Sequence, residues 1–392
     1  MDFNTNRHLD SLLQNLRSTA ETPFESTTPM PAAVYHSESF HQLEQEKIFS
    51  KSRICVGRED EISKPGDYLT HEIAKVSVIV IRQQDNAIKS FVNACAHRFA
   101  CLLKTQKGSA KKITCPYHAW TYNPAGELIR SPYMEMKPGF EQGKVKLKEL
   151  PIECWQGFIF VSLDTPDEDS LEETLSPLTD NIVGRYQMPV YQTVLRESMS
   201  WNANWKNLVE NYTESYHVPM AHGKTFAQHD KKLEDYSCGE DSLHYGYHLA
   251  AKSSDEGQGS AHPANQRLAG EWRKTMVDFC IFPGMLVTLM PDYLWYVSVQ
   301  PDGVDRFKAT WGVAMPPEVL ANIPEEKYEQ WVADFKTYID IANDEDKLIV
   351  EALHKGTTSP TLPRGQYHPL ERNLWQFNRY LASKCHQPSV TE

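Results

Sequence analysis

The sequence predicts an α+β protein in two parts, a small all-β domain followed by a larger domain in which helices flank an antiparallel sheet. The chain has 392 residues, more than the roughly 250–300 at which a single core stops growing, so about two domains are expected. Short β-like runs fill residues 52–162, whereas helical patterns (201–217, 326–355 and 369–383) flank β-rich segments (243–251, 276–300 and 305–315) beyond residue 166.

The first domain is expected at 51–165 and the second at 166–392. Runs such as "VSVIVIRQ", "AIKSFVNAC", "KKITC" and "GFIFVSL" alternate with the turn sequences "KPGD" and "NPAGE", which is typical of short strands. Residues 1–50 are expected to form an arm and a helix that pack on the second domain. The stretch "STAETPFESTTPMPAAVY" is rich in Ser, Thr and Pro, so ordered structure is expected to begin near Pro31.

Composition excludes several classes of function. The formal charge is −12, which argues against nucleic acid or an anionic membrane as a partner. The longest apolar stretch, "MVDFCIFPGMLVTLM", is shorter than the ~20 residues of a membrane span and reads as two buried strands around a turn. The first residues lack the apolar core of a signal peptide, and eight cysteines in so long a chain do not suggest a disulfide scaffold. We therefore expect a cytoplasmic protein.

Two Cys and two His side chains form the most specific motif, within "CAHRFACLLKTQKGSAKKITCPYHAWTY". Cys95-x-His97 is followed by Cys115-x-x-His118, so each loop supplies one thiolate and one imidazole. A zinc site more often pairs ligands of one kind within each loop. Mixed loops suit a two-iron centre in which one iron takes both thiolates and the other both imidazoles, the Rieske [2Fe–2S] centre. Mononuclear zinc and unrelated placement of the four residues are the alternatives.

From "KPGDY" to the last predicted helix, the sequence resembles the terminal oxygenase component of the Rieske non-haem iron oxygenases. The resemblance implies that Cys95 and Cys115 bind one iron and that His97 and His118 bind the other. It also implies a second domain that is helix-grip-like and holds a mononuclear Fe(II), because a Rieske cluster only moves electrons.

The segment "NWKNLVENYTESYHVPMAH" is the candidate iron site. On a helix over 201–217, one stripe is apolar, and a second contains Glu214 and His217; a solvated face is the alternative for this second stripe. His217 and His222 would lie about 140° apart on an ideal helix, so the helix must break between them, and Pro219 gives a reason. Two imidazoles and one carboxylate make the triad that leaves positions open on Fe(II) for O₂, and the two histidines match the family's E/D-x-x-H-x4-H motif.

The carboxylate is expected from "NDEDKLIVEALHKG", which offers Asp344 and Asp346. Asp346 shares its helix face with Ile349, Val350 and Leu353, and a lone acid on an apolar stripe is costly unless it is paired or binds a metal. We therefore predict Asp346 as the third ligand, with Asp344 as the alternative.

The chain has no Gly-x-Gly-x-x-Gly motif for a dinucleotide, so a separate reductase must supply electrons from NAD(P)H. The resemblance implies a flavin reductase, often with an iron–sulfur domain. Arg98, Lys104, Lys107, Lys111 and Lys112 form a run without acidic residues, which would steer an acidic redox partner; an ordinary solvated loop is the alternative.

The sequence around Glu214 is most like the branch of the family that acts on carnitine, choline and betaine. We therefore expect a monooxygenase that hydroxylates a small quaternary amine, with possible C–N cleavage. Aromatic rings bind such cations, and Tyr293 and Trp295 are the candidates, with core packing as the alternative. The other hypotheses are a hydroxylase of aromatic carboxylic acids and a non-catalytic Rieske electron carrier.

The resemblance also implies a ring of three subunits in which each cluster feeds the neighbour's iron. We expect a homotrimer; three chains with a separate small subunit are the alternative. Glu214 is expected about 60° from His217 around the same helix, where it would accept hydrogen bonds from His217 and from His118 of the next subunit.

Overall fold

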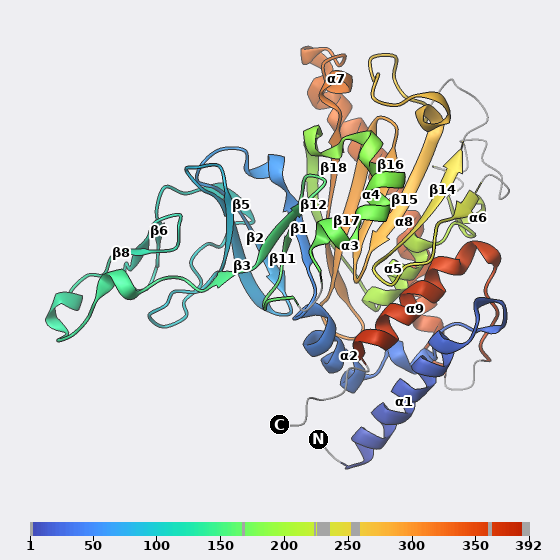
Figure 1. Ribbon diagram of the computed structural model, residues 1–392, viewed down its shortest axis with the longest axis horizontal. Helices are drawn as coiled ribbons and strands as arrows, with labels where there is room; N and C mark the ends of the chain where they lie inside the picture. The colour runs from blue at the N-terminus through green and yellow to red at the C-terminus, as the bar shows by residue number, and fades with distance from the viewer. Residues whose placement is uncertain are drawn as a thin grey trace. The chain divides into compact units, whose positions relative to one another are not determined.

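The computed structural model describes residues 3–166, 169–222, 225, 236–251, 259–359 and 363–385. The chain forms two compact units. One unit is Phe49–Glu173, and the other combines Met1–Ile48 with Thr174–Glu392 (Figure 1). Within the described residues, no helix is long and apolar enough to cross a membrane.

The unit Phe49–Glu173 is built from three small antiparallel sheets, with only short helical turns. The first sheet has the order β1 (Ile54–Arg58), β11 (Phe158–Val161) and β10 (Ile152–Trp155). The second has the order β5 (Lys107–Ser109), β2 (Asp67–Ile73), β3 (Val76–Arg82), β4 (Ile88–Val92) and β9 (Glu149–Leu150). The third contains β6 (Ile113–Thr114), β7 (Thr121–Tyr122) and β8 (Leu128–Arg130). These strands confirm the predicted all-β domain.

The larger unit contains a seven-stranded antiparallel sheet. Its strand order is β12 (Gln192–Trp201), β18 (Phe307–Met315), β17 (Tyr293–Pro301), β16 (Met285–Met290), β15 (Thr275–Ile281), β14 (Tyr245–Ala251) and β13 (Tyr236–Cys238). The apolar stretch around Pro283 and Gly284 forms β15, a turn and β16, as predicted. Both strands are buried along their whole length.

Helices pack against this sheet, as the α+β prediction required. α5 (Trp205–Thr213) contacts β14 to β17, α8 (Tyr328–Gly356) contacts β12, and α9 (Arg372–Cys385) contacts β14. α1 (Phe3–Glu21) packs against α9, so the first and last described helices lie side by side (Figure 1). The remaining helices are short: α2 (Glu38–Glu44), α3 (Leu171–Thr174), α4 (Ser176–Asn181), α6 (Val218–Ala221) and α7 (Pro317–Leu320).

Two buried contacts tie the N-terminal segment to α5. Lys206 Nζ lies 2.6 Å from Glu44 Oε1, and both side chains are inaccessible to solvent. The hydroxyl of Tyr35 donates to both carboxylate oxygens of Glu210, at 2.7 and 2.8 Å. α5 itself begins at Asn204, whose side chain accepts from the backbone N–H of Lys206, a typical N-cap. The N-terminal segment therefore holds the helix that leads to the predicted iron ligands.

Two expectations about local structure were wrong. Ordered structure begins well before Pro31, because α1 gains its stability from packing on α9, a contact that local composition cannot reveal. The helix predicted over 201–217 is confined to Trp205–Thr213, since Trp201 ends β12 and Glu214 is extended (φ −124°, ψ 156°).

Candidate functional site

Two loops of the smaller unit present the predicted cluster ligands, and the two have matching backbones. In each loop the N–H of the cysteine bonds to the carbonyl five residues later, Ala100 after Cys95 and Trp120 after Cys115. In each, the residue four positions after the cysteine donates back to the carbonyl of that cysteine and has a positive φ. These residues are Phe99 (61°) and Ala119 (56°).

The loops bury the cysteines and expose the histidines. Cys95 and Cys115 are buried, whereas the rings of His97 and His118 are accessible, with centroids 4.7 Å apart. The hydroxyl of Tyr122 accepts from the N–H of Ala96 at 3.1 Å, so its own proton is available to Cys95 Sγ, 3.3 Å away. Hydrogen bonds to cluster sulfurs are one means by which a protein tunes the reduction potential. Two buried thiolates behind two exposed imidazoles are the donor set that a Rieske cluster requires.

The second group of ligands gathers where α5 ends. His217 precedes the single helical turn α6 and His222 follows it, so this turn sets the separation of the two rings. The chain changes direction at Glu214 to His217, and Pro219 lies in the first turn of the new helix. The proline therefore starts α6 and does not break α5, which corrects the predicted position of the break.

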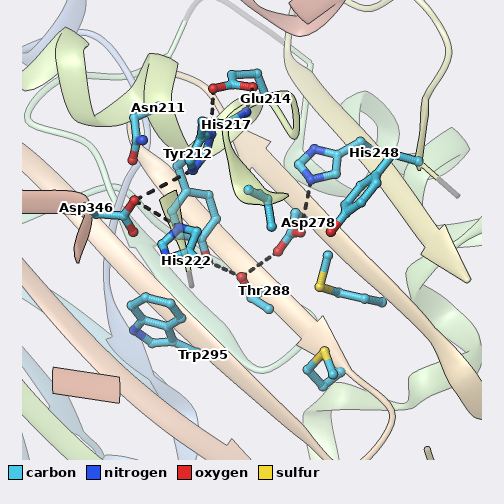
Figure 2. Close-up of a pocket in the computed structure, with 14 residues that line it drawn as sticks. Asn211, Tyr212, Glu214, His217, His222, His248, Asp278, Thr288, Trp295 and Asp346 are labelled. Atoms are coloured by element: carbon cyan, nitrogen blue, oxygen red, sulfur yellow. Dashed lines mark hydrogen bonds and ion pairs between the residues drawn. The ribbon is translucent and has the colours of Figure 1, made fainter. Parts of the chain in front are cut away.

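Asp346 on α8 completes the group, as Figure 2 shows. Its Oδ1 lies 3.7 Å from His217 Nε2 and 3.2 Å from His222 Nε2. Asp346 is buried, whereas the alternative candidate, Asp344, is exposed. Burial disfavours ionisation of Asp346, but its attraction to the two imidazoles holds its pKa at about 2.

The donor set fits a metal ion. Asp346 Oδ1 is buried and makes no well-aligned hydrogen bond within the described part of the chain, although two imidazole nitrogens approach it. Three donor atoms that converge without bonding to one another leave a common point for a cation, and two His with one carboxylate are the ligands of non-haem Fe(II).

Carboxylates fix the tautomers of both histidines. His217 Nδ1 lies 2.5 Å from Glu214 Oε1, and His222 Nδ1 lies 3.1 Å from Glu345 Oε2. A proton held on each Nδ1 leaves each Nε2 free to bind metal. Glu214 reaches His217 because a turn folds the extended residue back, and its other oxygen accepts from the N–H groups of Tyr216 and His217. The predicted neighbour relation is therefore present, but the reason given for it, a shared helix, was wrong.

A small cavity adjoins the three ligands and is closed on one side by the sheet. Its volume is about 50 Å³, against ~10–15 Å³ for one water by the same measure. The described residues that line it, besides the three ligands, are Asn211, Tyr212, Glu214, Val218, Tyr236, His248, Met276, Asp278, Thr288, Met290 and Trp295. Of the two predicted substrate residues, Trp295 is among them. Tyr293 lines a neighbouring cavity and packs on Phe335, with ring centroids 5.0 Å apart, so its role in substrate binding stays a prediction.

Comparison with known proteins agrees with this geometry. Residues 188–387 match the family described as "Ring hydroxylating alpha subunit (catalytic domain)", and residues 52–151 match "Rieske [2Fe-2S] domain". The chain belongs to the Rieske ring-hydroxylating oxygenases. Such an oxygenase carries a [2Fe–2S] cluster in its first domain and a mononuclear iron in its second. The fold, cofactors and enzyme class expected from the sequence are thereby confirmed.

Relatives of the oxygenase include enzymes of quaternary amines. The carnitine monooxygenase oxygenase subunit of Escherichia coli K12 is 28% identical over 341 residues, covering 86% of each chain. The glycine betaine monooxygenase oxygenase subunit of Chromohalobacter salexigens is 34% identical over 194 residues, which are 49% of this chain and 43% of that protein. The crystal structure of the quaternary ammonium Rieske monooxygenase CntA in complex with L-carnitine has a TM-score of 0.77 and 22% identity, covering 96% and 99% of the two chains, which shows the shared fold.

Sequence reasoning missed several residues of the oxygenase pocket. Glu345 was not considered, although the rule that a metal-bound His donates its second N–H to a carboxylate pointed to an acid beside Asp346. Asp278 lies within the longest apolar stretch of the sequence and was not singled out as a site residue. Asn211 lines the cavity, and its Oδ1 is buried without a hydrogen-bond partner in the described chain. No pattern in the sequence pointed to this residue.

A second cavity of the oxygenase, which we call the outer cavity, lies on the other side of Glu214 and His217. It has a volume of about 690 Å³ and is lined by the N-terminal segment, α5, α8 and residues 363–374. Glu214, His217 and Asn211 line both cavities. These side chains therefore form a wall one residue thick.

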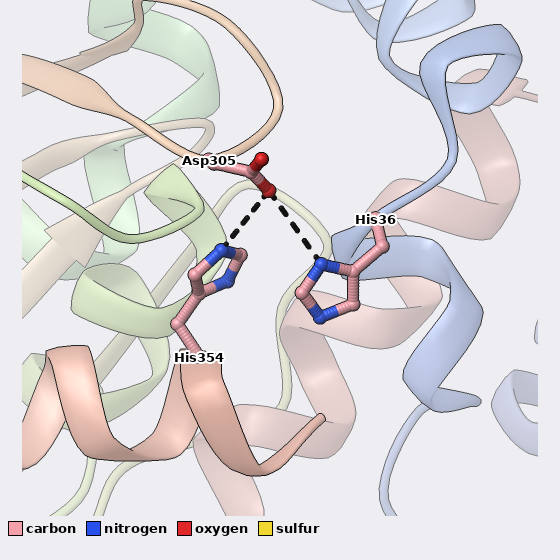
Figure 3. A group of neighbouring side chains, drawn as sticks. All are labelled: His36, Asp305 and His354. Carbon is pink, nitrogen blue, oxygen red and sulfur yellow. Dashed lines mark hydrogen bonds and ion pairs between the residues drawn. The ribbon is translucent and has the colours of Figure 1, made fainter. Parts of the chain in front are cut away.

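A second cluster of two His and one Asp resembles the iron triad in composition (Figure 3). Asp305 Oδ1 lies 3.6 Å from His36 Nδ1 and 3.1 Å from His354 Nε2. However, His354 Nδ1 accepts from the backbone N–H of Asn204 at 3.3 Å, which places the ring proton on Nε2, the atom that a metal would need. The cluster is therefore a hydrogen-bonded contact between the N-terminal segment, the turn at Asp305 and α8.

Proposed function

We propose that this oxygenase is the terminal component of a monooxygenase that hydroxylates a small quaternary ammonium compound, with C–N cleavage where the new hydroxyl adjoins the nitrogen. The observation that carries the proposal is the charge of the cavity beside the iron ligands. Among the described residues that line it there are carboxylates, His, Trp and Tyr, but no Lys or Arg. Such a lining favours a cation.

The same observation argues against an aromatic carboxylate as substrate. A buried carboxylate needs a cationic partner, most often Arg, and the described cavity lining offers none. The small volume also favours a compact head group over a ring system. The names of the relatives point in the same direction, since they act on carnitine and glycine betaine.

We assign the metal ligands as follows. Cys95 and Cys115 would bind one iron of the cluster, and His97 and His118 would bind the other. His217, His222 and Asp346 would hold the mononuclear Fe(II), which would supply the activation of O₂. Glu214 and Glu345 hold the histidine protons on Nδ1, which leaves each Nε2 for the metal.

We further propose a homotrimer in which the cluster edge of one subunit docks beside Glu214 of the next. Two exposed apolar patches support this. The cluster edge exposes Phe99, Tyr117, Tyr133 and Met136, and the surface around Glu214 and α8 exposes Tyr216, Met220, Leu348 and Leu353. Two different complementary patches on one chain make a head-to-tail contact, and a rotation of one third of a turn per contact closes such contacts into a ring of three. The structure of a related quaternary ammonium Rieske monooxygenase gave insights into inter-subunit electron transfer.

Glu214 is the proposed bridge between the two metal centres. One of its oxygens contacts His217 Nδ1, and the residue also lines the outer cavity, where His118 of a neighbouring subunit would approach. Glu210 is a poor substitute, because Tyr35 already occupies both of its oxygens. Glu214→Ala loaded with iron should retain its cluster spectrum but lose most single-turnover product.

A separate flavin and iron–sulfur reductase is the proposed source of electrons from NAD(P)H. The exposed basic run of Lys104, Lys107 and Lys111 supports an acidic docking partner. None of the eight cysteines, all of which lie in the described part of the chain, forms a disulfide, which suits a reducing compartment such as the cytoplasm.

Reductase-driven turnover tests the function. We expect substrate-dependent O₂ uptake and a hydroxylated product with carnitine, choline, glycine betaine or proline betaine, and none with benzoate-type acids. The preparation should contain three irons per chain, whereas a simple Rieske carrier holds two. Coupled turnover of an aromatic acid and of no amine would refute the substrate class; an unchanged product yield from Glu214→Ala would remove the bridge alone.

A further inference from the structure

A row of four side chains crosses the sheet beneath the iron ligands. His248 on β14 pairs with Asp278 on β15, Asp278 pairs with Thr288 on β16, and Thr288 pairs with Trp295 on β17. Directly opposite residues on antiparallel strands project to the same face. All four line the cavity beside the iron ligands, and Figure 2 shows Thr288 between Tyr212 and Asp278.

Hydrogen bonds in this row converge on Asp278. The hydroxyl of Thr288 donates to Asp278 Oδ1 at 2.5 Å. Because a threonine has one hydroxyl proton, the contact of 2.6 Å between Tyr212 and Thr288 must have Tyr212 as its donor. On the other side His248 Nε2 lies 3.0 Å from Asp278 Oδ2, although it makes no well-aligned hydrogen bond within the described part of the chain. One oxygen of the buried carboxylate is thus hydrogen-bonded, and the other faces an imidazole nitrogen.

His248 is the basic side chain beside Asp278 among the described residues that line the cavity, and neither Lys nor Arg, which would carry a permanent charge, lines this space. The iron ligands do not neutralise Asp278, because Asp346, Glu214 and Glu345 already set three carboxylates around an ion of charge two. A buried acid without a permanent cation beside it is costly. The cavity is therefore built to receive a positive charge.

We propose that Asp278 is the counter-ion of the substrate's ammonium group and sets the preference for quaternary over primary amines. This inference rests on the proposed function and names the residue that would select quaternary amines as substrates. A quaternary nitrogen has no N–H to donate and needs only the charge of Asp278, whose Oδ1 already accepts from Thr288 and whose Oδ2 faces His248. A primary ammonium would lose its hydrogen bonds to water and find one oxygen of Asp278 taken by Thr288 and the other screened by the ring of His248. Trp295 and Tyr212 supply aromatic surface beside the charge.

Binding of choline and of its uncharged carbon analogue, 3,3-dimethylbutan-1-ol, isolates the charge. Calorimetry on the anaerobic holoenzyme needs no turnover and no reductase. The wild-type protein should bind choline at least about 30-fold more tightly than the alcohol, and Asp278→Asn should reduce that ratio to within about twofold. Asp292→Asn is the matched control: Asp292 is a partly buried acid at a separate cavity, where it accepts from Asn265 and from the N–H of His262. This control should keep the wild-type ratio.

The possible failures are distinguishable. If the wild-type protein does not prefer choline to the alcohol, the proposed substrate class and this inference both fail. If Asp278→Asn still prefers choline to the alcohol, only this inference is overturned, because another group then binds the positive charge. A visible circular dichroism spectrum of the cluster confirms that the variant is folded.

A ligand series on the wild-type protein tests the same idea without any mutation. Affinity should fall from choline through N,N-dimethylethanolamine to ethanolamine, with at least a tenfold loss over the series. Ethanolamine binding as tightly as choline would show that Asp278 still seeks a hydrogen-bond donor, and this would overturn the proposal even if Asp278→Asn did not fold.

Discussion

Glu210→Gln should stabilise the larger unit at neutral pH. Glu210 lies one helical turn before Glu214, lines the outer cavity and is held by Tyr35. Burial, opposed by the hydrogen bond from Tyr35 and by Lys206, raises the pKa of Glu210 from 4.5 to about 7. Gln keeps the shape of the side chain and can still accept from Tyr35, but it carries no charge that burial can penalise.

The magnitude follows from the linkage between protonation and folding. Between pH 4.5 and about pH 7 the folded state holds a proton that the unfolded chain releases, so the wild-type protein loses stability as the pH rises through this window. At about 1.36 kcal/mol per pKa unit, the loss is at most about 3 kcal/mol, a ceiling because the outer cavity admits water. The Gln side chain of Glu210→Gln does not titrate. The free energy of unfolding of this variant should therefore rise above that of the wild-type protein, by up to this amount, between pH 5 and pH 8.

Thermal unfolding of both proteins from pH 5 to pH 8 measures the effect. The difference in Tm should grow with pH to several degrees, since about 1 kcal/mol corresponds to roughly 2–4 °C in a unit of this size. Glu318→Gln is a control of opposite sign, because its hydrogen bond with Arg267 lowers the pKa of Glu318. A Tm difference for Glu210→Gln that does not change with pH would refute the reasoning.

Three further changes probe other features. Phe99→Gly should stabilise the smaller unit by about 1 kcal/mol, because glycine adopts a φ of 61° without the penalty of a side chain. The same change should weaken self-association in ultracentrifugation. Cluster absorbance in denaturant measures the stability, and a variant less stable than the wild-type protein would show that the backbone at Phe99 is not strained. Lys206→Met should lower the free energy of unfolding by roughly 3–5 kcal/mol, because Glu44 remains buried without its cationic partner. The double variant that adds Glu44→Leu should regain most of this stability in the same denaturation assay. Burial, and next the charge of His36, lowers the pKa of His354, so the folded state resists protonation. The wild-type protein therefore loses stability as the pH falls below about 6.5. His354→Gln should lose less stability than the wild-type protein between pH 7 and pH 5, and equal losses in the two proteins would exclude His354 as a cause.

Local pattern was enough for most strands and for α8 and α9. Alternation and β-branched runs located β3, β4 and β11, and the interrupted apolar stretch around Pro283 located β15 and β16. The spacing of Cys95, His97, Cys115 and His118 identified the cluster motif, since few sites need both ligand types in each loop.

What the sequence could not supply depends on contacts between distant segments. α5 ends at Thr213 because the chain then turns so that Glu214 can accept from the N–H groups of Tyr216 and His217, and no periodicity foretells such a turn. Asp278 shows a different failure. The rule that singled out Asp346, an acid on an apolar face, applied equally to this strand, but its meaning depended on the cross-strand register that places it beside Thr288 and His248.

The wall formed by Glu214, His217 and Asn211 has a thermodynamic consequence. A ligand in the inner cavity and a protein surface at the outer cavity would touch opposite sides of the same side chains, so neither can shift them without changing the free energy of the other. Any such coupling is reciprocal: the factor by which substrate tightens or loosens the contact between subunits must equal the factor by which that contact changes the affinity for substrate. Assembly of the oligomer and binding of the substrate would then be coupled through a layer one residue thick.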